Sequence, residues 1–462
     1  MVRTHHQQPT LWTGFLKEEV DDLWEPWMRG ADVLLDDEEL IDQVFEAQGR
    51  RWKRSRTRGR LQTPSEVVLR LLVLKHIRNW SYQSLEREVR ANLVYRSFAR
   101  IGGEKVPDAK TMGRLGQTIG PEVVAGLHRR IVELAVEKKV VQGRKMRVDT
   151  TVVETNIHYP TDSSLLGDGT RVLTRLMKKV ASTVGELKEK VRDRMRSVRK
   201  KVVSVAIAAR CKGEAGEQQR RGLYKGLLSL SRKIVNQAGR VAKEVATLPK
   251  KTQAKVRGLV EQMEGIGERT KQVIRQTKAR IFDGDTKYPD KVTSMFEPHT
   301  EIIRKGKASK PNEFGKLVKV QEAENQIITH VEVFELRPAD SDLLVDAVAK
   351  HEAVCGRTPD LVAADAGFYS QANEKALDEK GVKRVSIPNR NTKSAARNKY
   401  QKQRWFKNGQ RWRTGCEGRI SVLKRRHGLD RCLYPGQNGM KRWVGMGVIA
   451  DNLINIGLQL VV

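Results

Sequence analysis

One stretch near the carboxyl end of the chain carries an acid between two cations. Glu417 follows Arg413 by four residues and precedes Lys424 by seven, so the three side chains can share one face of a helix. Apolar residues at helical spacing and the lack of proline favour a helix here. Its carboxylate could bind a divalent metal ion while the cations bind phosphates. A solvated helix with incidental ion pairs is the alternative.

Two aspartates upstream favour the metal site over that alternative. Asp149 lies inside a β-branched segment, residues 145–153, which is typical of a strand. Asp365 lies where a short apolar strand ends and Gly367 lets the chain turn. In open α/β sheets, ligands bind at the carboxyl ends of strands. The two aspartates and Glu417 are therefore predicted to form a three-carboxylate metal site.

The same three segments resemble the motifs of DDE transposases of bacterial insertion sequences. Arg413, Glu417 and Lys424 match the signature around that family's last acid, with Gln410 where the signature has a tyrosine. Residues 148–154 are similar to the segment of the first acid, and residues 364–369 to the segment of the second. The resemblance is to the ISNCY-type group, and it covers residues 60 to 160 and 295 to 460.

This resemblance implies an enzyme that cleaves and joins DNA at the ends of an insertion sequence. It implies Asp149, Asp365 and Glu417 as catalytic residues and as ligands of two Mg²⁺ ions, which Mn²⁺ can replace. Carboxylates suit such hard cations, and a metal pair can stabilise both the attacking and the leaving oxygen. The expected partners are double-stranded DNA, as terminal inverted repeats and target, and further copies of the chain in a homodimer or higher oligomer. A cytoplasmic, nucleoid-associated protein without a membrane partner is expected.

Strands and helices around these acids are predicted to alternate. The further segments, in chain order, are a hairpin at residues 314–320 and 326–334, a helix at 340–355, the Asp365 strand, a helix at 371–380 and a strand at 384–387. With the Asp149 strand first and the Glu417 helix last, the order is β, β, β, α, β, α, β, α. Together with the family resemblance, this order predicts an α/β RNase H-like catalytic domain made of residues 141–160 and 296–462.

The charge of the chain predicts a polyanionic partner. Its 462 residues contain 88 Lys and Arg against 55 Asp and Glu, a formal charge of +33. Nucleic acid is the commonest partner of such a protein. The length allows two or three domains. No signal peptide is evident, and polar residues within the apolar stretch 444–462 predict a core helix rather than a membrane span.

Two parts of the first 140 residues, the basic stretch at 50–60 and the helices at 63–140, are the ones expected to contact DNA. Residues 1–62 combine an acidic segment with a basic stretch, residues 50–60, in which seven of eleven residues are Lys or Arg. Residues 63–140 show short helices of helix-turn-helix character, for which a purely structural helical domain is the alternative. The basic stretch is either an arm along the DNA or a solvated linker. The predicted DNA contacts are Arg54, Arg56, Arg58, Arg413, Arg419 and Lys424.

Residues 161–295 are predicted to interrupt the catalytic domain with a basic helical insertion. Between residues 171 and 280 there are thirty Lys and Arg against nine Asp and Glu. Apolar residues spaced by three and four from Leu173 to Val202 predict one long helix, roughly 45 Å at ~1.5 Å per residue. Two more helical runs follow. The apolar seam packs within the insertion or between two copies, and the basic exterior holds DNA or is merely solvated.

Three other functions share parts of this pattern. A nuclease of the same fold would carry the same acids and cut without joining. A domesticated, non-catalytic protein would bind DNA through its helices and basic insertion, although the intact set of acids argues against it. A scaffold for RNA is disfavoured because no aromatic stacking motif is present.

Overall fold

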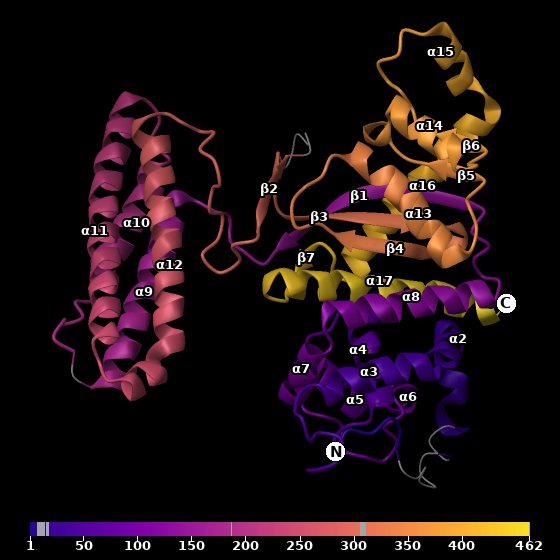
Figure 1. The fold of residues 1–462 in the computed structure, drawn as a ribbon, viewed down its shortest axis with the longest axis horizontal. Coiled ribbons are helices and arrows are strands. Elements are labelled where there is room, and N and C mark those ends of the chain that lie inside the picture. The colour runs from indigo at the N-terminus through magenta and orange to yellow at the C-terminus, as the bar shows by residue number, and fades with distance from the viewer. Residues whose placement is uncertain (7–13, 15–17, 186, 305–310, 462) are drawn as a thin grey trace. The chain divides into compact units, whose positions relative to one another are not determined.

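The computed structural model describes residues 1–6, 14, 18–185, 187–304 and 311–461. It divides the chain into two compact units (Figure 1). The first is formed by Met1–Asn156 and Ile303–Val462, and the second by Ile157–Ile302. Each unit has a hydrophobic core of its own. The predicted insertion, residues 161–295, lies inside the second unit.

A mixed sheet forms the centre of the catalytic part of the first unit. Its strands are β1 (Lys145–Thr155), β2 (Glu301–Arg304), β3 (Asn312–Glu322), β4 (Ile328–Val333), β5 (Leu361–Ala363), β6 (Arg384–Ser386) and β7 (Arg431–Cys432). Within the described residues the order is β2-β3-β1-β5-β6, with β4 also paired to β3 and β7 to β1. β3 runs antiparallel to β1 and β4, whereas β5 and β7 run parallel to β1, and β6 parallel to β5.

Helices connect these strands, and the elements follow one another in the predicted order. They are α13 (Leu344–Cys355), α14 (Gln371–Glu379), α15 (Ala395–Lys402), α16 (Arg404–Arg426) and α17 (Gly436–Val461). The principal elements follow one another as β1, β3, β4, α13, β5, α14, β6 and α16, which is the predicted alternation. The helix that bears Glu417 is longer than its apolar pattern indicated, because it already begins at Arg404.

Side chains along β1 point alternately to the two faces of the sheet, and different helices cover these faces. Met146 and Val148 point to one face, where they share a core with Leu344 of α13 and Leu377 of α14. Arg147 points the other way and contacts α16 through a hydrogen bond to the carbonyl oxygen of Trp412. Because successive residues of a strand face opposite sides, Asp149 lies on the α16 face with Arg147.

The remaining helices of the first unit share a core with α17. They are α2 (Pro26–Leu35), α3 (Glu38–Gly49), α4 (Ser65–Ile77), α5 (Tyr82–Ala91), α6 (Leu93–Phe98), α7 (Ala109–Thr118) and α8 (Pro121–Glu137). A single hydrophobic cluster joins α2, α4 and α8 to Ile449 and Leu453 of α17. Buried Arg70 of α4 holds Asp32 and Asp36, each at 2.6 Å. The predicted segments 1–62 and 63–140 thus belong to the same compact unit as the catalytic sheet.

The last helix, α17, is long and apolar enough to cross a membrane, but it packs inside the protein. Of its most apolar window, 67% is buried. It contacts α2, α4 and α8, and α8 lies alongside it in Figure 1. Its polar residues are used internally: Asn452 donates to the carbonyl oxygen of Ile328 at 2.8 Å, and buried Asp451 pairs with Arg419. These contacts fit the expected core helix.

Residues 50–62 are folded against the first residues of the chain. Backbone N–H groups donate from Val2 to Ser55 at 2.9 Å, from Gln62 to Met1 at 3.0 Å and from Ser65 to Arg3 at 2.9 Å. The basic stretch is therefore held to the first residues of the chain at Ser55 and Gln62. Its contact with DNA stays a prediction.

The second unit is a bundle of helices in its described part. They are α9 (Asp162–Val184), α10 (Met195–Ala208), α11 (Glu214–Ala246) and α12 (Lys250–Phe282). The single long helix predicted from Leu173 to Val202 is wrong, because α9 ends before Gly185, whose φ of 87° is left-handed. Leu187 and Val191, which follow the break, pack on the same core as the helices. The apolar spacing therefore continues through a segment that is not helical.

Candidate active site

The first acid lies beside a gap in the pairing of β1. On that edge, β5 pairs with β1 from Lys145 to Arg147, and β7 pairs with it from Glu154. In the described structure, β1 has no strand partner on this edge between those positions. Asp149 falls in the gap, two residues beyond the end of the β5 pairing, and its side chain is 15% exposed. A carboxylate is thus held on a rigid strand with an open strand edge beside it.

The second acid follows β5 at the matching position. Arg147 of β1 pairs with Ala363 of β5 in parallel register, so Asp149 and Asp365 each come two residues after this pair. The Asp365 carboxylate accepts a hydrogen bond from the backbone N–H of Gly367 at 2.8 Å. Because parallel strands end at the same edge of a sheet, the two aspartates belong to one region of the fold.

A further aspartate, Asp340, borders this region and is not among the acids predicted from the sequence. Asp340 accepts a hydrogen bond from the hydroxyl of Thr150, the neighbour of Asp149, at 3.2 Å. A Cβ on Gly367 would lie 3.2 Å from Asp340 Oδ2 and 3.1 Å from Asp365 Oδ1. Asp340 therefore lies near both predicted ligands, next to Thr150 on the Asp149 side and next to Gly367 on the Asp365 side. The 190 residues that separate Thr150 and Asp340 along the chain explain why local sequence patterns missed this contact.

One face of α16 brings the third acid to the same region. Gln410 donates its amide N–H to the carbonyl oxygen of Ala364, directly before Asp365, at 3.2 Å, and also to Ser386. One turn later, Arg413 lies 3.6 Å from Asp149 and 2.7 Å from Glu417. Since positions three, four and seven apart share a helix face, this face spans the ends of β5 and β6 and the gap in β1.

Arg413 occupies the space between two of the predicted metal ligands. Its guanidinium pairs with both Asp149 and Glu417, while Asp365 accepts a hydrogen bond from its own turn. No three His, Cys, Asp or Glu side chains in the described part of the chain stand close enough together to hold a metal ion. The donor chemistry nevertheless fits a hard divalent cation, because all the acids offer oxygen and the nearby Cys416 is buried.

A buried ion pair and two close contacts fix α16 against the sheet. Arg147 donates to Glu322 of β3 at 2.9 Å, and its guanidinium stacks 4.8 Å from the Trp412 ring. A Cβ on Gly415 would lie 2.3 Å from the Arg147 guanidinium, and one on Gly409 would lie 2.7 Å from the Ser386 side chain. These two glycines therefore allow the helix to approach β1 and β6 closely.

Burial sets the protonation of the groups beneath the acids. It raises the pKa of the Glu322 carboxyl even though the Arg147 guanidinium opposes the shift. Burial, with Glu322 and Asp149 nearby, raises the pKa of the Cys416 thiol well above its usual value. A neutral thiol is a poor nucleophile and a poor metal ligand. Cys416 therefore packs as a small buried residue.

The predicted DNA contacts differ in their surroundings. Arg419 does not fit that role, because its side chain is 7% exposed and pairs with Asp451 of α17 at 2.9 Å. Lys424 is half-buried, and Arg56 pairs with Glu46 at 2.5 Å. Arg54 and Arg58 are exposed. The partner of Arg419 lies 32 residues further on in another helix, so the local pattern could not show that it is buried.

Two family models match separate parts of the chain. One, described as Transposase domain (DUF772), matches residues 26–117, which contain α2 to α7 and the basic stretch. The other, described as Transposase DDE domain, matches residues 372–456, which contain Gln410, Arg413 and Glu417 on α16. Both matches are to transposase domains, and together they support a DDE transposase of an insertion sequence, as the motifs predicted. They identify the protein as a DNA transposase.

The two matches leave residues 118–371 uncovered. Asp149 and Asp365 both lie outside the matched segments, so the matches do not test their predicted roles. No curated protein and no solved structure matches the transposase.

Proposed function

We propose that this transposase, of the ISNCY-type group, cleaves and joins DNA at the ends of its insertion sequence by divalent-metal-dependent phosphoryl transfer. Asp149, Asp365 and Glu417 are its catalytic acids. The observation that carries the proposal is the convergence of three separate elements: Asp149 and Asp365 follow one register pair of neighbouring strands, and Arg413 joins Asp149 to Glu417. The RNase H-like fold is proposed with it, supported by the order of strands and helices.

The acids would hold two Mg²⁺ ions, replaceable by Mn²⁺, which would neutralise charge on the attacking and leaving oxygens of the phosphodiester. Asp149 has Asp365 on its sheet side and Glu417 on its helix side, so it is the ligand suited to both ions. Gln410 holds α16 against the strand that bears Asp365. Asp340 borders both aspartates and supports their orientation through Thr150.

Arg413 has to exchange partners when the substrate binds. In the structure its guanidinium neutralises Asp149 and Glu417, which are also the proposed ligands. The non-bridging oxygens of a phosphodiester are the natural alternative, because guanidinium groups bind phosphate as readily as carboxylate. Arg413 and Lys424 would then orient the DNA backbone over the acids, while the freed carboxylates bind cations.

The partners proposed for this chemistry are duplex DNA and further copies of the chain. The terminal inverted repeats and the target are the two DNA substrates, and a homodimer or higher oligomer brings two ends together. Cytoplasmic location, with association to the nucleoid when DNA is bound, follows from these substrates. The excess of 88 Lys and Arg over 55 Asp and Glu supports a nucleic-acid partner.

The test is a cleavage and strand-transfer assay on duplex carrying the element's ends. We expect Mg²⁺-dependent cuts and joined products with the unaltered protein. We expect neither product with Asp149→Asn, Asp365→Asn or Glu417→Gln, while each variant still binds the duplex.

Asp378→Asn is the matched control, since it removes one exposed carboxylate from α14. Cuts without joined products would identify a nuclease instead. Full activity in any of the three variants would remove that acid from the site, and binding without cleavage by the unaltered protein would favour the non-catalytic alternative.

A further inference from the structure

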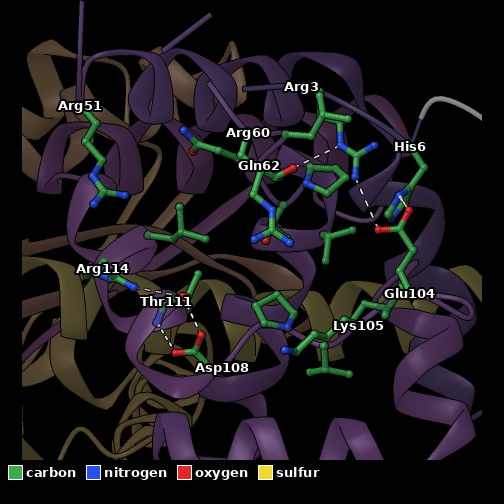
Figure 2. A pocket seen from close by; sticks show the side chains of 18 residues that line it. Arg3, His6, Arg51, Arg60, Gln62, Glu104, Lys105, Asp108, Thr111 and Arg114 are labelled. Carbon is green, nitrogen blue, oxygen red and sulfur yellow. Dashed lines mark hydrogen bonds and ion pairs between the residues drawn. The ribbon is translucent and has the colours of Figure 1, made fainter. Parts of the chain in front are cut away.

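A cavity of about 700 Å³ opens in the N-terminal part of the first unit, and none of the three proposed catalytic acids lines it. It is lined by the first residues of the chain, by Arg51 and residues 60–64, by Val67 of α4, and by the loop that leads into α7 together with the first turns of α7. Figure 2 shows Arg51, Arg60 and Arg114 together with Arg3 and Lys105 around this space. Five cations from distant positions in the sequence thus line one cavity.

The two acids in the lining are already engaged. Glu104 lies 2.9 Å from the His6 ring and 3.6 Å from Arg3. Asp108 caps α7, accepting hydrogen bonds from both the backbone N–H and the hydroxyl of Thr111 at 2.9 Å. Neither carboxylate is therefore available to neutralise the other cations of the cavity.

Three of the cations remain without a partner. The side chains of Arg51, Arg60 and Lys105 are exposed and make no hydrogen bond or ion pair to any residue that the structure describes. Arg114 contacts only neutral groups, the hydroxyl of Thr111 at 3.2 Å and the carbonyl oxygen of Lys110 at 3.4 Å. Like charges gathered without counter-charges repel one another, so an anion that bridges them is stabilising.

Apolar side chains also line the cavity, which limits the kinds of anion that would suit it. Leu61, Val67, Ile101, Val106 and Leu115 line it together with Pro64 and Pro107. A polynucleotide backbone has the same two properties in alternation, charged phosphates and apolar sugar edges. Phosphate oxygens can bind the guanidinium groups while sugar carbons pack on the apolar side chains.

We propose that this cavity, lined by Arg51, Arg60, Lys105 and Arg114, is a docking site for the sugar–phosphate backbone of duplex DNA. It rests on the proposed function only in taking DNA as the substrate, and it is independent of the metal chemistry at Asp149. The cations bind the backbone without reading its sequence, and so fix where the DNA lies on the helices. The ordered fold of residues 50–62 makes this possible, because it holds Arg51 and Arg60 in place before DNA arrives.

The experiment measures duplex binding at several salt concentrations by fluorescence anisotropy, with metal removed by a chelator. The probe is a short duplex of mixed sequence. Each phosphate contact contributes about 0.9 to the slope of log affinity against log salt. We expect Arg51→Ala/Arg60→Ala to lower that slope by about 1.8, and Lys105→Ala/Arg114→Ala to do the same.

Lys138→Ala/Lys375→Ala is the control matched in charge, because both lysines are exposed and neither lines the cavity. An unchanged slope in the cavity variants, or the same decrease in the control, would overturn the proposal. So would tight binding of inorganic phosphate with an unchanged duplex slope, which would identify a small-anion site. Unchanged melting temperatures show that the variants fold. Because duplex binding is measured without metal, a loss of binding in these variants says nothing against the catalytic proposal. That proposal is tested separately, by the cleavage assay.

Discussion

At the residue scale, Gln410 links the helix of the last acid to the strand of the second. Its amide donates to the carbonyl oxygens of Ala364 and Ser386, which end β5 and β6. Both acceptors belong to residues that are fully or almost fully buried. Without the Gln410 amide donor, these two buried carbonyl oxygens lose a hydrogen bond. The loss lowers the free energy of unfolding by about 1–3 kcal/mol. Gln410 is therefore a positioning residue for Glu417, seven residues further along the same face.

Gln410→Glu tests this role, because it keeps the shape of the side chain and replaces its donor with an acceptor. We expect the free energy of unfolding to fall by about 1–3 kcal/mol. We expect the cleavage rate at saturating DNA to fall by about 100-fold, the order expected when a catalytic group moves by an ångström. Denaturant unfolding and single-turnover cleavage measure the two effects.

Asn408→Ala serves as the control on the same helix, since Asn408 is exposed. A rate that falls in Gln410→Glu while DNA affinity is kept supports the positioning role. Equal rates in the two variants would show that the Gln410 hydrogen bonds do not position the site.

At the scale of elements, His128 joins α8 to β4 and α17. Its Nε2 donates to the carbonyl oxygen of Ile328 at 2.9 Å, and Asn452 of α17 lies 3.3 Å away. Burial lowers the pKa of His128 from 6.5 to about 4, and that of nearby His330 to about 3. Both rings are therefore neutral in the folded protein at pH values where the unfolded chain already binds protons.

Stability is consequently expected to fall as the solution is acidified. A histidine whose folded pKa is depressed contributes its full stability above the unfolded pKa of 6.5, and that contribution is lost as pH falls toward about 4. The loss from His128 alone is about 3 kcal/mol, at 1.36 kcal/mol per unit of pKa difference. We expect His128→Gln to unfold with a shallower dependence on pH over this range. Denaturant unfolding at each pH measures it, with exposed His158→Gln as the control.

A pH dependence of His128→Gln identical to that of the unaltered protein would show that His128 titrates normally. His76 and His351 are also buried with lowered pKa values, so they add acid sensitivity of the same sign. The comparison between variants isolates His128 because the other histidines are kept in both.

The elements also show what a sequence can and cannot reveal. The β-branched segment around Asp149, the turn after Asp365 and the helix of Glu417 are local signals, and all three elements are observed. The burial of Arg419 and the ordering of the basic stretch depend on Asp451 and on residues 1–3, which are distant in sequence. The break at Gly185 was hidden because the non-helical segment beyond it packs on the same apolar core. Long-range partners, rather than local propensity, decided each of these cases.

At the scale of the molecule, the helical unit Ile157–Ile302 is separable from the rest. It has its own core, and the chain leaves and re-enters the other unit through strands of the same sheet, β1 and β2. We expect a variant in which a Gly/Ser linker replaces residues 157–300 to keep its sheet and to melt cooperatively. Its binding of mixed-sequence duplex should show a markedly smaller salt slope, since thirty Lys and Arg lie between residues 171 and 280.

Two measurements decide whether this unit holds DNA or acts as a dimerisation stalk. Fluorescence anisotropy gives the salt slope of duplex binding, and sedimentation gives the oligomeric mass. A smaller slope with an unchanged mass supports DNA holding. An unchanged slope with loss of a dimer would contradict it and identify a dimerisation stalk.

The central claim is that Asp149, Asp365 and Glu417 jointly hold divalent cations once Arg413 has turned to DNA. Its most direct test is electron paramagnetic resonance of Mn²⁺ titrated into the protein bound to duplex carrying the element's end. The account predicts bound Mn²⁺ with the unaltered protein and with Asp378→Asn. It predicts loss of that bound signal in Asp149→Asn, and weaker binding in Asp365→Asn and Glu417→Gln. Undiminished Mn²⁺ binding in all three variants would contradict the account.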